Sequence, residues 1–350
     1  MLPQEPRAPQ ETGAPQETGA PQGPHTLRAL QTSQAPSVRE DLQVLLELNP
    51  APPVQATLPL LTAAIGSASV VLALADRKSD TLLLRVNAGD QDRLLVLKVY
   101  DEAHPGRGAS AGRAGREAYA LLRLAQAGVC VPGLVASGKR ALLRRYVEGP
   151  TVRDLHWDVA LARQLAEWVF RCHAAPAVDA TGGIDMAGGI DATGADVESC
   201  TAETTGVDQT PGAEEHGLGQ SGLVGDMNLG NFVLDVASGR LCGIDLGDTR
   251  IGDPLDDVGE GCMRIVGRRP GFTADRWECA VAFASWYGSL AGGVEYVLSR
   301  VPERASASFR QMAVWRNDPF MAEVADAFPF LWGEALLSFR RAKQEELFGR

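Results

Sequence analysis

The stretch VGDMNLGNFVLDVASGRLCGIDLGDTRIGDPLDDV, residues 224–258, decides how the rest of the chain is interpreted. Asp226 and Asn231 are separated by four residues, and a short apolar run follows them. After a Ser-Gly turn, a second apolar run leads directly to Asp245-Leu246-Gly247. This order predicts a loop, a strand, a turn, a second strand and then a carboxylate.

These residue types suit phosphoryl transfer. The reaction needs a carboxylate that orients and deprotonates the attacking hydroxyl, and an amide oxygen and a second carboxylate that hold magnesium on the phosphates. Asp226, Asn231 and Asp245 are of these types and in this order. Asp, Asn and Gly are also the ordinary residues of turns, so either piece alone indicates a hairpin turn. The joint spacing favours the catalytic interpretation.

An upstream lysine supplies a second part of the pattern. Lys98 lies inside the apolar run 94–100, where a cation costs free energy unless it is paired. A single strand lysine commonly lies at a sheet edge with its amine in water. Here a partner is available, because the expected helix 112–126 carries Glu117 in its first half. A phosphate-binding lysine oriented by a helix glutamate belongs to the kinase arrangement, so we expect Lys98 and Glu117 to pair.

Composition and charge bound the class of protein. Of 350 residues, 45% are hydrophobic, which suffices for a packed core. The first residues lack the pattern of a signal peptide, and no apolar run approaches the roughly 18 residues of a membrane span. We therefore expect a cytoplasmic protein without a membrane partner. The arginines are scattered along the chain, which argues against a nucleic-acid partner.

The net charge of −11 is concentrated in one segment. Residues 178–222 contain nine Asp and Glu residues and no Lys or Arg, so the rest of the chain is close to neutral. We interpret 178–222 as a disordered acidic insertion. The six cysteines, at positions 130, 172, 200, 242, 262 and 279, form no Cys-x-x-Cys pair. They predict reduced, mostly buried thiols.

The domain organisation follows from the order of the patterns. Residues 1–36 are a low-complexity tail in which APQETG occurs twice in tandem, and we expect them to be disordered. Residues 37–148 form a small β-rich lobe with one helix, and residues 149–350 form a mainly helical lobe that contains the insertion. The expected strands are 70–75, 81–86, 94–100 and 140–148. The expected helices are 37–48, 112–126, 158–174, one beginning at Pro254, 273–290, 294–300, 304–316, 321–328 and 331–347.

With these residues in order, the chain from about Ser69 to Gly261 resembles the aminoglycoside phosphotransferase and choline kinase branch of the protein-kinase-like fold. GDMNLGNFVLD and GIDLGDTRIGDPLDDV are similar to the family's H-G-D-x-x-x-x-N and I-D-W/F-x-x-x-x-x-G-D-P-x-x-D segments. The resemblance implies an α+β, two-lobed fold and an enzyme that uses ATP and Mg²⁺ to phosphorylate a hydroxyl of a small molecule.

The resemblance also implies residue roles. Asp226 would be the catalytic base, and Asn231 and Asp245 the magnesium ligands. Lys98 would bind the phosphates with Glu117 as its partner. In a kinase of two lobes, backbone groups of 145–147, including Tyr146 and Val147, would contact the adenine. Asp257 would correspond to a structural Asp that braces the catalytic loop.

Two departures from the family pattern are visible. Val224 occupies the position of the family's His, which keeps apolar packing but loses a hydrogen bond that supports the loop. The turn 76–80 contains no glycine-rich phosphate loop. We expect His173, at the end of the helix 158–174, to be a surface or capping residue.

Two other functions stay open. A pseudokinase or scaffold would bind nucleotide, or only a partner, and transfer nothing. An atypical protein kinase is the enzyme alternative, although no Ala-Pro-Glu element follows Asp245 and the helix at Pro254 begins too soon for a long activation segment. The sequence indicates neither the phosphoacceptor nor the oligomeric state.

Overall fold

The computed structural model describes residues 49–50, 69–75, 79–88, 91–100, 112–138, 141–176, 219–269 and 271–348. The expected tail 1–36, the expected helix 37–48 and all but the last residues of the acidic segment 178–222 lie outside these residues. Strand β7 begins at Ser221, so its first residues lie inside the range 178–222 that we assigned to the insertion.

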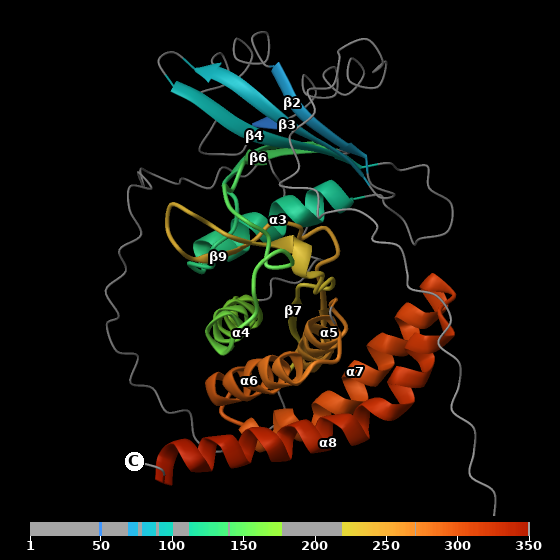
Figure 1. The fold of residues 1–350 in the computed structure, drawn as a ribbon. Coiled ribbons are helices and arrows are strands. Elements are labelled where there is room, and N and C mark those ends of the chain that lie inside the picture. Colours follow the sequence, from blue (N-terminus) through green and yellow to red (C-terminus); the bar gives the residue numbers. More distant parts are fainter. Residues whose placement is uncertain are drawn as a thin grey trace, which may run out of the picture. The chain divides into compact units, whose positions relative to one another are not determined.

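An antiparallel sheet carries the first part of the candidate site (Figure 1). Its strand order is β1-β5-β6-β4-β3-β2, with register Thr81↔Lys98 and Lys98↔Leu142 through the centre. Helix α3, Arg113–Gln126, packs against β4, β5 and β6. The strands are β1 (Asn49–Pro50), β2 (Ser69–Ala75), β3 (Ser79–Ala88), β4 (Gln91–Tyr100), β5 (Leu134–Ser137) and β6 (Ala141–Arg145).

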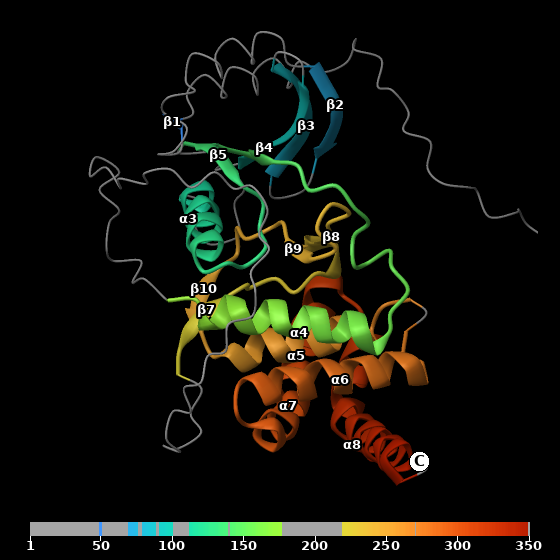
Figure 2. The ribbon, with the colours of Figure 1, turned by 90° about the vertical axis from the view of Figure 1, so that its left-hand side faces the viewer.

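Five helices form most of the remaining described chain, and Figure 2 shows α4, α5, α6 and α7 packed on one another. Side chains of Asp158, Asp253 and Thr273 accept hydrogen bonds from backbone N–H groups in the first turns of α4, α5 and α6. Such caps explain where these helices begin. The helices are α4 (Val159–Ala174), α5 (Pro254–Val266), α6 (Ala274–Leu290), α7 (Val294–Arg316) and α8 (Pro319–Phe348).

Short elements connect these helices with the sheet. Strand β7, Ser221–Leu223, pairs with β10, Arg250–Gly252. The 3-10 turn η2, Leu229–Asn231, precedes β8, Phe232–Leu234, which pairs with β9, Leu241–Gly243. The predicted order of loop, strand, turn, strand and carboxylate is therefore confirmed, and so is the α+β class.

The four short helices expected after residue 294 are wrong as separate elements. The chain forms two long helices, α7 and α8, which contain Pro302 and Pro329 in their interiors. Each proline falls in a gap between two of the expected helices, and proline removes one backbone hydrogen bond of a helix. In α7 the buried residues on both sides of Pro302, such as Leu298 and Ala305, continue one apolar face. Packing of that face outweighs the lost hydrogen bond.

The prediction of six reduced thiols is also wrong. Cys130 and Cys242 form a disulfide between residues 112 positions apart, with their Cα atoms 4.7 Å from each other. Sequence spacing could not reveal this pair, because the contact exists only after β9 has packed beside the segment that follows α3. Cys172, Cys262 and Cys279 are buried free thiols, as expected. Burial raises the pKa of Cys172 to about 12.

Loss of the disulfide is expected to lower the free energy of unfolding by about 2–4 kcal/mol, since the crosslink restricts a long loop of the unfolded chain. Urea unfolding of the oxidised wild type and of Cys130→Ser would measure this difference. The variant should not respond to reductant, whereas the wild type should lose stability when reductant is added. Equal midpoints for the oxidised wild type and the variant would contradict the expectation.

None of the helices in the described part of the chain combines the length and the apolarity that a membrane span requires.

Candidate active site

The loop that carries Asp226 is held in shape by its own backbone. Gly225 has φ of 80°, and a Cβ atom there would lie 2.0 Å from the carbonyl oxygen of Asp248. Only glycine suits this conformation and this close approach. Asn228 caps the following turn η2, because its side chain accepts a hydrogen bond from the Gly230 N–H at 3.1 Å. The loop therefore places Asp226 and Asn231 on either side of a fixed turn.

The two polar residues of the loop are tied to each other. The Asn231 side-chain N–H donates to the Asp226 carbonyl oxygen at 3.2 Å, and the Asp226 carboxylate accepts from the Asn228 N–H at 3.1 Å. The Ile244 N–H donates to the Asn231 carbonyl oxygen at 2.8 Å, which brings Asn231 beside the chain at Asp245. The structure thus gathers Asp226, Asn231 and Asp245 at one place.

Lys98 joins three elements in one ion-paired cluster. Its Nζ donates to Oε2 of Glu117 on α3 at 2.9 Å and to Oδ1 of Asp245 after β9 at 2.7 Å. Lys98 is 6% exposed and Glu117 is fully buried. The structure therefore places the predicted pair Lys98–Glu117 in contact, and it adds Asp245 as a second partner.

The buried charges shift one another's pKa values. Burial alone would raise the pKa of Asp245, but the Lys98 ammonium and the Gly247 N–H outweigh it and hold that pKa below its usual range. Burial lowers the pKa of Lys98 by itself, and the two carboxylates more than reverse this effect. Burial raises the pKa of Glu117, against the charge of Lys98. The Lys98 ammonium thus faces two carboxylates, and its charge opposes the effect of burial on the pKa of each of them.

A second buried cation, Arg144, was missed in the sequence. Arg144 on β6 pairs in register with Val96 and lies on the same face of the sheet as Lys98, two residues further along β4. It is 6% exposed, and its charge acts on both Glu117 and Asp245. The available signal was weaker than for Lys98, because Arg144 follows the apolar run 141–143 and precedes a second arginine.

Asp257 on α5 supports the loop that carries Asp226. Its carboxylate accepts hydrogen bonds from the Val224 N–H at 2.6 Å, from the Gly225 N–H at 3.1 Å and from His173 Nε2 at 3.0 Å. Asp257 is 1% exposed. It contacts the backbone on the amino side of Asp226, as the expected brace would.

The expectation for His173 is wrong. His173 is buried, and its second ring nitrogen, Nδ1, lies 2.9 Å from the Tyr287 hydroxyl on α6. Burial raises the pKa of Tyr287. The Val224 side chain packs in the core, as expected, while a histidine from α4 makes the contact to Asp257. Because α4 precedes the loop by 50 residues, only the tertiary structure could show that His173 reaches this position.

Arg264 on α5 contacts the Asp226 carboxylate directly. Its Nη2 lies 3.3 Å from Oδ1 of Asp226 and 2.7 Å from Oε1 of Glu260, one helical turn away. Burial raises the pKa of Glu260, against the Arg264 charge. Neither residue belongs to the motifs, and their spacing of four after the helix start at Pro254 is the signal by which this ion pair could have been predicted.

The expected adenine-binding segment follows β6, which ends at Arg145, three residues before the strand end that we predicted. The N–H groups of Arg145 and Tyr146 already donate to the carbonyl oxygens of Gly133 and Leu94. Among the described residues, the Val147 N–H has no hydrogen-bond acceptor. The Tyr146 side chain is exposed. The chain after it lies beside β8 and the residues that follow β8, because the Leu234 and Val236 N–H groups donate to the carbonyl oxygens of Pro150 and Glu148.

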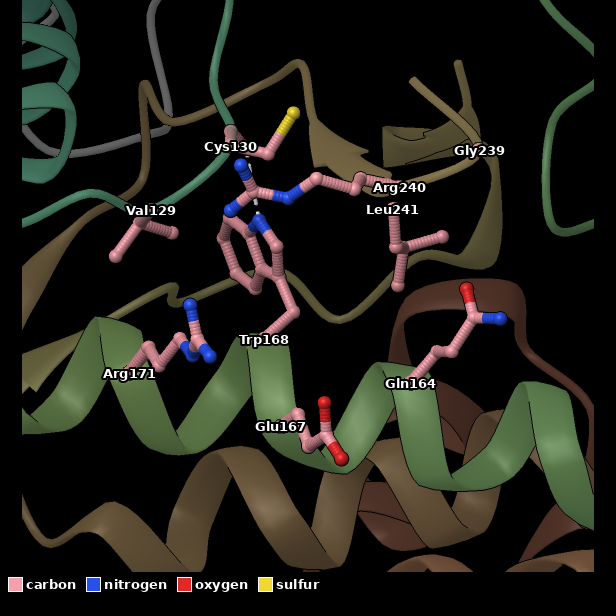
Figure 3. Close-up of a pocket in the computed structure, with 9 residues that line it drawn as sticks. All are labelled: Val129, Cys130, Gln164, Glu167, Trp168, Arg171, Gly239, Arg240 and Leu241. Carbon is pink, nitrogen blue, oxygen red and sulfur yellow. Dashed lines mark hydrogen bonds between the residues drawn. The ribbon is translucent and has the colours of Figure 1, made fainter. Parts of the chain in front are cut away.

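A separate cavity of about 150 Å³ lies beside the disulfide (Figure 3). Gln164, Glu167, Trp168 and Arg171 from α4 line it, opposite the turn between β8 and β9. The Trp168 indole N–H donates to the Cys130 carbonyl oxygen at 2.9 Å. None of the predicted site residues lines this cavity, so it is distinct from the candidate active site.

The residues near Asp245 fit a magnesium ion. Asn231 uses its side-chain N–H internally, which leaves its Oδ1 as an acceptor, and the contacts of Asp245 fall on Oδ1, which leaves Oδ2. Magnesium prefers such oxygen donors and completes its coordination with waters and substrate phosphates. The described residues contain no group of three or more His, Cys, Asp or Glu that could hold a metal by themselves.

No protein-family model and no curated protein sequence matches the chain. Solved structures do. A type VIII aminoglycoside-3'-phosphotransferase is 21% identical, with 63% of this chain and 85% of that chain covered and a TM-score of 0.41. The choline kinase from Cryptosporidium parvum is 10% identical, with 89% and 96% covered and a TM-score of 0.49. The amicoumacin kinase hAmiN, in complex with AMP-PNP, Ca²⁺ and Ami, is 14% identical, with 83% and 92% covered and a TM-score of 0.49. These are members of the protein-kinase-like fold that the motifs resemble.

Proposed function

We propose that the chain is an ATP- and magnesium-dependent kinase that phosphorylates a hydroxyl of a small molecule. The observation that carries this proposal is the cluster in which Lys98 bridges Glu117 and Asp245 across β4, α3 and the chain after β9. Three segments that are distant in the sequence meet at this buried lysine. The loop with Asp226 and Asn231 lies next to Asp245 of the cluster. This combination is what phosphoryl transfer requires.

Each residue has a task in the proposed reaction. Lys98 binds phosphate oxygens of ATP, and Glu117 holds its amine in place. The Val147 N–H contacts the base, and the Tyr146 ring lies beside it. Asn231 and Asp245 hold magnesium, which neutralises charge on the phosphates when it is bound.

Asp226 then acts on the acceptor. The hydroxyl oxygen attacks the γ-phosphorus, the bond between this phosphorus and the oxygen on the β-phosphate breaks, and ADP leaves. Asp226 accepts the hydroxyl proton. Its contact with Arg264 orients the carboxylate for this step.

The proposal is tested by phosphoryl transfer from γ-labelled ATP to a panel of amino alcohols, sugars, aminoglycosides and hydroxy acids. We expect labelled product with at least one class, and only when magnesium is present. Absence of product with every compound, together with nucleotide binding that does not respond to magnesium, would instead favour a nucleotide-binding scaffold.

A further inference from the structure

Three arginines follow the catalytic loop: Arg264 on α5, Arg268 in the bend after α5, and Arg276 on α6. Arg264 contacts Asp226, and Arg268 comes four residues later. Gly267, the C-cap of α5, is the only residue between the helix and Arg268, so Arg268 follows directly from the helix end that contacts Asp226.

Arg276 reaches the same region from the first turn of α6. Its guanidinium lies 5.7 Å from the centre of the Trp157 ring. The chain at Trp157 is bonded to the catalytic loop, because the Trp157 indole donates to Val152 and the next residue, Arg153, donates its N–H to the Leu229 carbonyl. The segment that Arg276 covers thus adjoins η2.

Both arginines have buried donors without acceptors. Among the described residues, Nε of Arg268 and Nη1 of Arg276 are buried and make no hydrogen bond. Burial and the neighbouring charge of Arg268 lower the pKa of Arg276. The acidic residues near these arginines have other contacts or positions. Glu260 binds Arg264, Asp158 caps α4, and Asp275 directly precedes Arg276 in the chain.

This arrangement is unfavourable without an anion. Two like charges are close together, buried donors are unsatisfied, and Arg276 is a cation at the amino end of a helix, where the helix dipole favours anions. A helix-capping role accounts for a basic residue only at a carboxyl end, so it does not account for Arg276. A bound oxyanion would satisfy the free donors and offset the repulsion.

We propose that Arg268 and Arg276 bind an anionic group, a carboxylate or a phosphate ester, of the alcohol that presents its hydroxyl to Asp226. This inference rests on the proposed kinase function and narrows its acceptor to small hydroxy compounds of negative charge. Because Arg268 follows Arg264 by four residues, and Arg264 contacts Asp226, we place the anion within the length of a few-carbon molecule from the reacting hydroxyl.

The test compares glycerate and glycerol 3-phosphate with neutral glycerol and cationic choline, both as acceptors and as ligands in calorimetric titrations with an ATP analogue present. We expect one of the anionic compounds to bind and to be phosphorylated best, and the two of them distinguish carboxylate from phosphate. Arg268→Glu and Arg276→Glu should weaken its binding and raise its KM by about 10- to 100-fold, as for lost charge-assisted hydrogen bonds, with little change in kcat.

Arg268→Lys and Arg276→Gln serve where charge reversal prevents folding, and Arg268→Lys should recover part of the affinity. Arg310→Glu is the matched control, because Arg310 is exposed and pairs with Asp326 on α8. Preference for choline, equal binding of the anions by wild type and variants, or no binding of either anion would overturn the inference. The wild type could instead bind an anion that the variants do not bind, and yet phosphorylate no compound. That result would support the anion site and contradict the proposed kinase function.

Discussion

Asp226→Asn is expected to lower kcat for phosphoryl transfer by about 10²- to 10⁴-fold, the usual contribution of a general base. The amide keeps the shape of the side chain but cannot accept the hydroxyl proton. The KM for ATP should stay the same, because the contacts of Lys98 with Glu117 and Asp245 do not involve the Asp226 carboxylate. Steady-state kinetics with the acceptor found in the panel would measure both parameters.

Asp235→Asn is the control for this variant. Asp235 lies in the same segment, but within the described chain its carboxylate accepts hydrogen bonds from the turn at Ala237 and Ser238 alone. We expect wild-type kcat for Asp235→Asn. If Asp226→Asn also retained wild-type kcat, Asp226 would not be the base, and the assignment of the catalytic loop would have to be abandoned.

Asp257→Ala is expected to lower the free energy of unfolding by about 3–5 kcal/mol, as for other buried charged groups whose partners lose their counterpart. The change leaves the N–H groups of Val224 and Gly225 and the ring of His173 without their acceptor. Because these N–H groups precede Asp226 directly, kcat should fall as well, even at temperatures where the variant is folded. Urea unfolding and kinetics on the folded variant would measure the two effects.

The neighbouring residue supplies the matched control. Asp256 accepts a hydrogen bond from Arg304 at 3.0 Å, but its side chain is 38% exposed. Half-exposed ion pairs of this kind contribute below about 1 kcal/mol, so Asp256→Ala should be close to wild type. Equal losses for Asp256→Ala and Asp257→Ala would show that the brace has no special role.

The parts of the site that are close in sequence could be predicted from the sequence. The Asp-x4-Asn loop, the hairpin β8–β9 and the carboxylate after it are set by local turn chemistry and by short apolar runs, and the structure has them in that order. The pairing of Lys98 with Glu117 could also be predicted, although the two residues are far apart in the sequence. A cation in an apolar strand needs a counter-charge, and the expected helix 112–126 contains a glutamate.

The parts of the site and fold that depend on packing between distant elements could not be predicted from the sequence. The contacts of Arg144 and the disulfide Cys130–Cys242 join residues that are far apart in the sequence. These residues come together only when the sheet and the helices pack. Local patterns also divided α7 and α8 at their prolines, since a local rule cannot weigh a lost hydrogen bond against a continuous buried face.

The candidate residues Asp226, Asn231 and Asp245 could be found in the sequence, because their types and spacing are local properties of one loop and one hairpin. The residues that support them could be found only in the folded chain. His173 binds Asp257 from α4, although Val224 occupies the expected position of a histidine, and Arg264 binds Asp226 from α5. The physical reason is that a buried carboxylate needs a partner in space, and any element that the fold brings within hydrogen-bond distance can provide it.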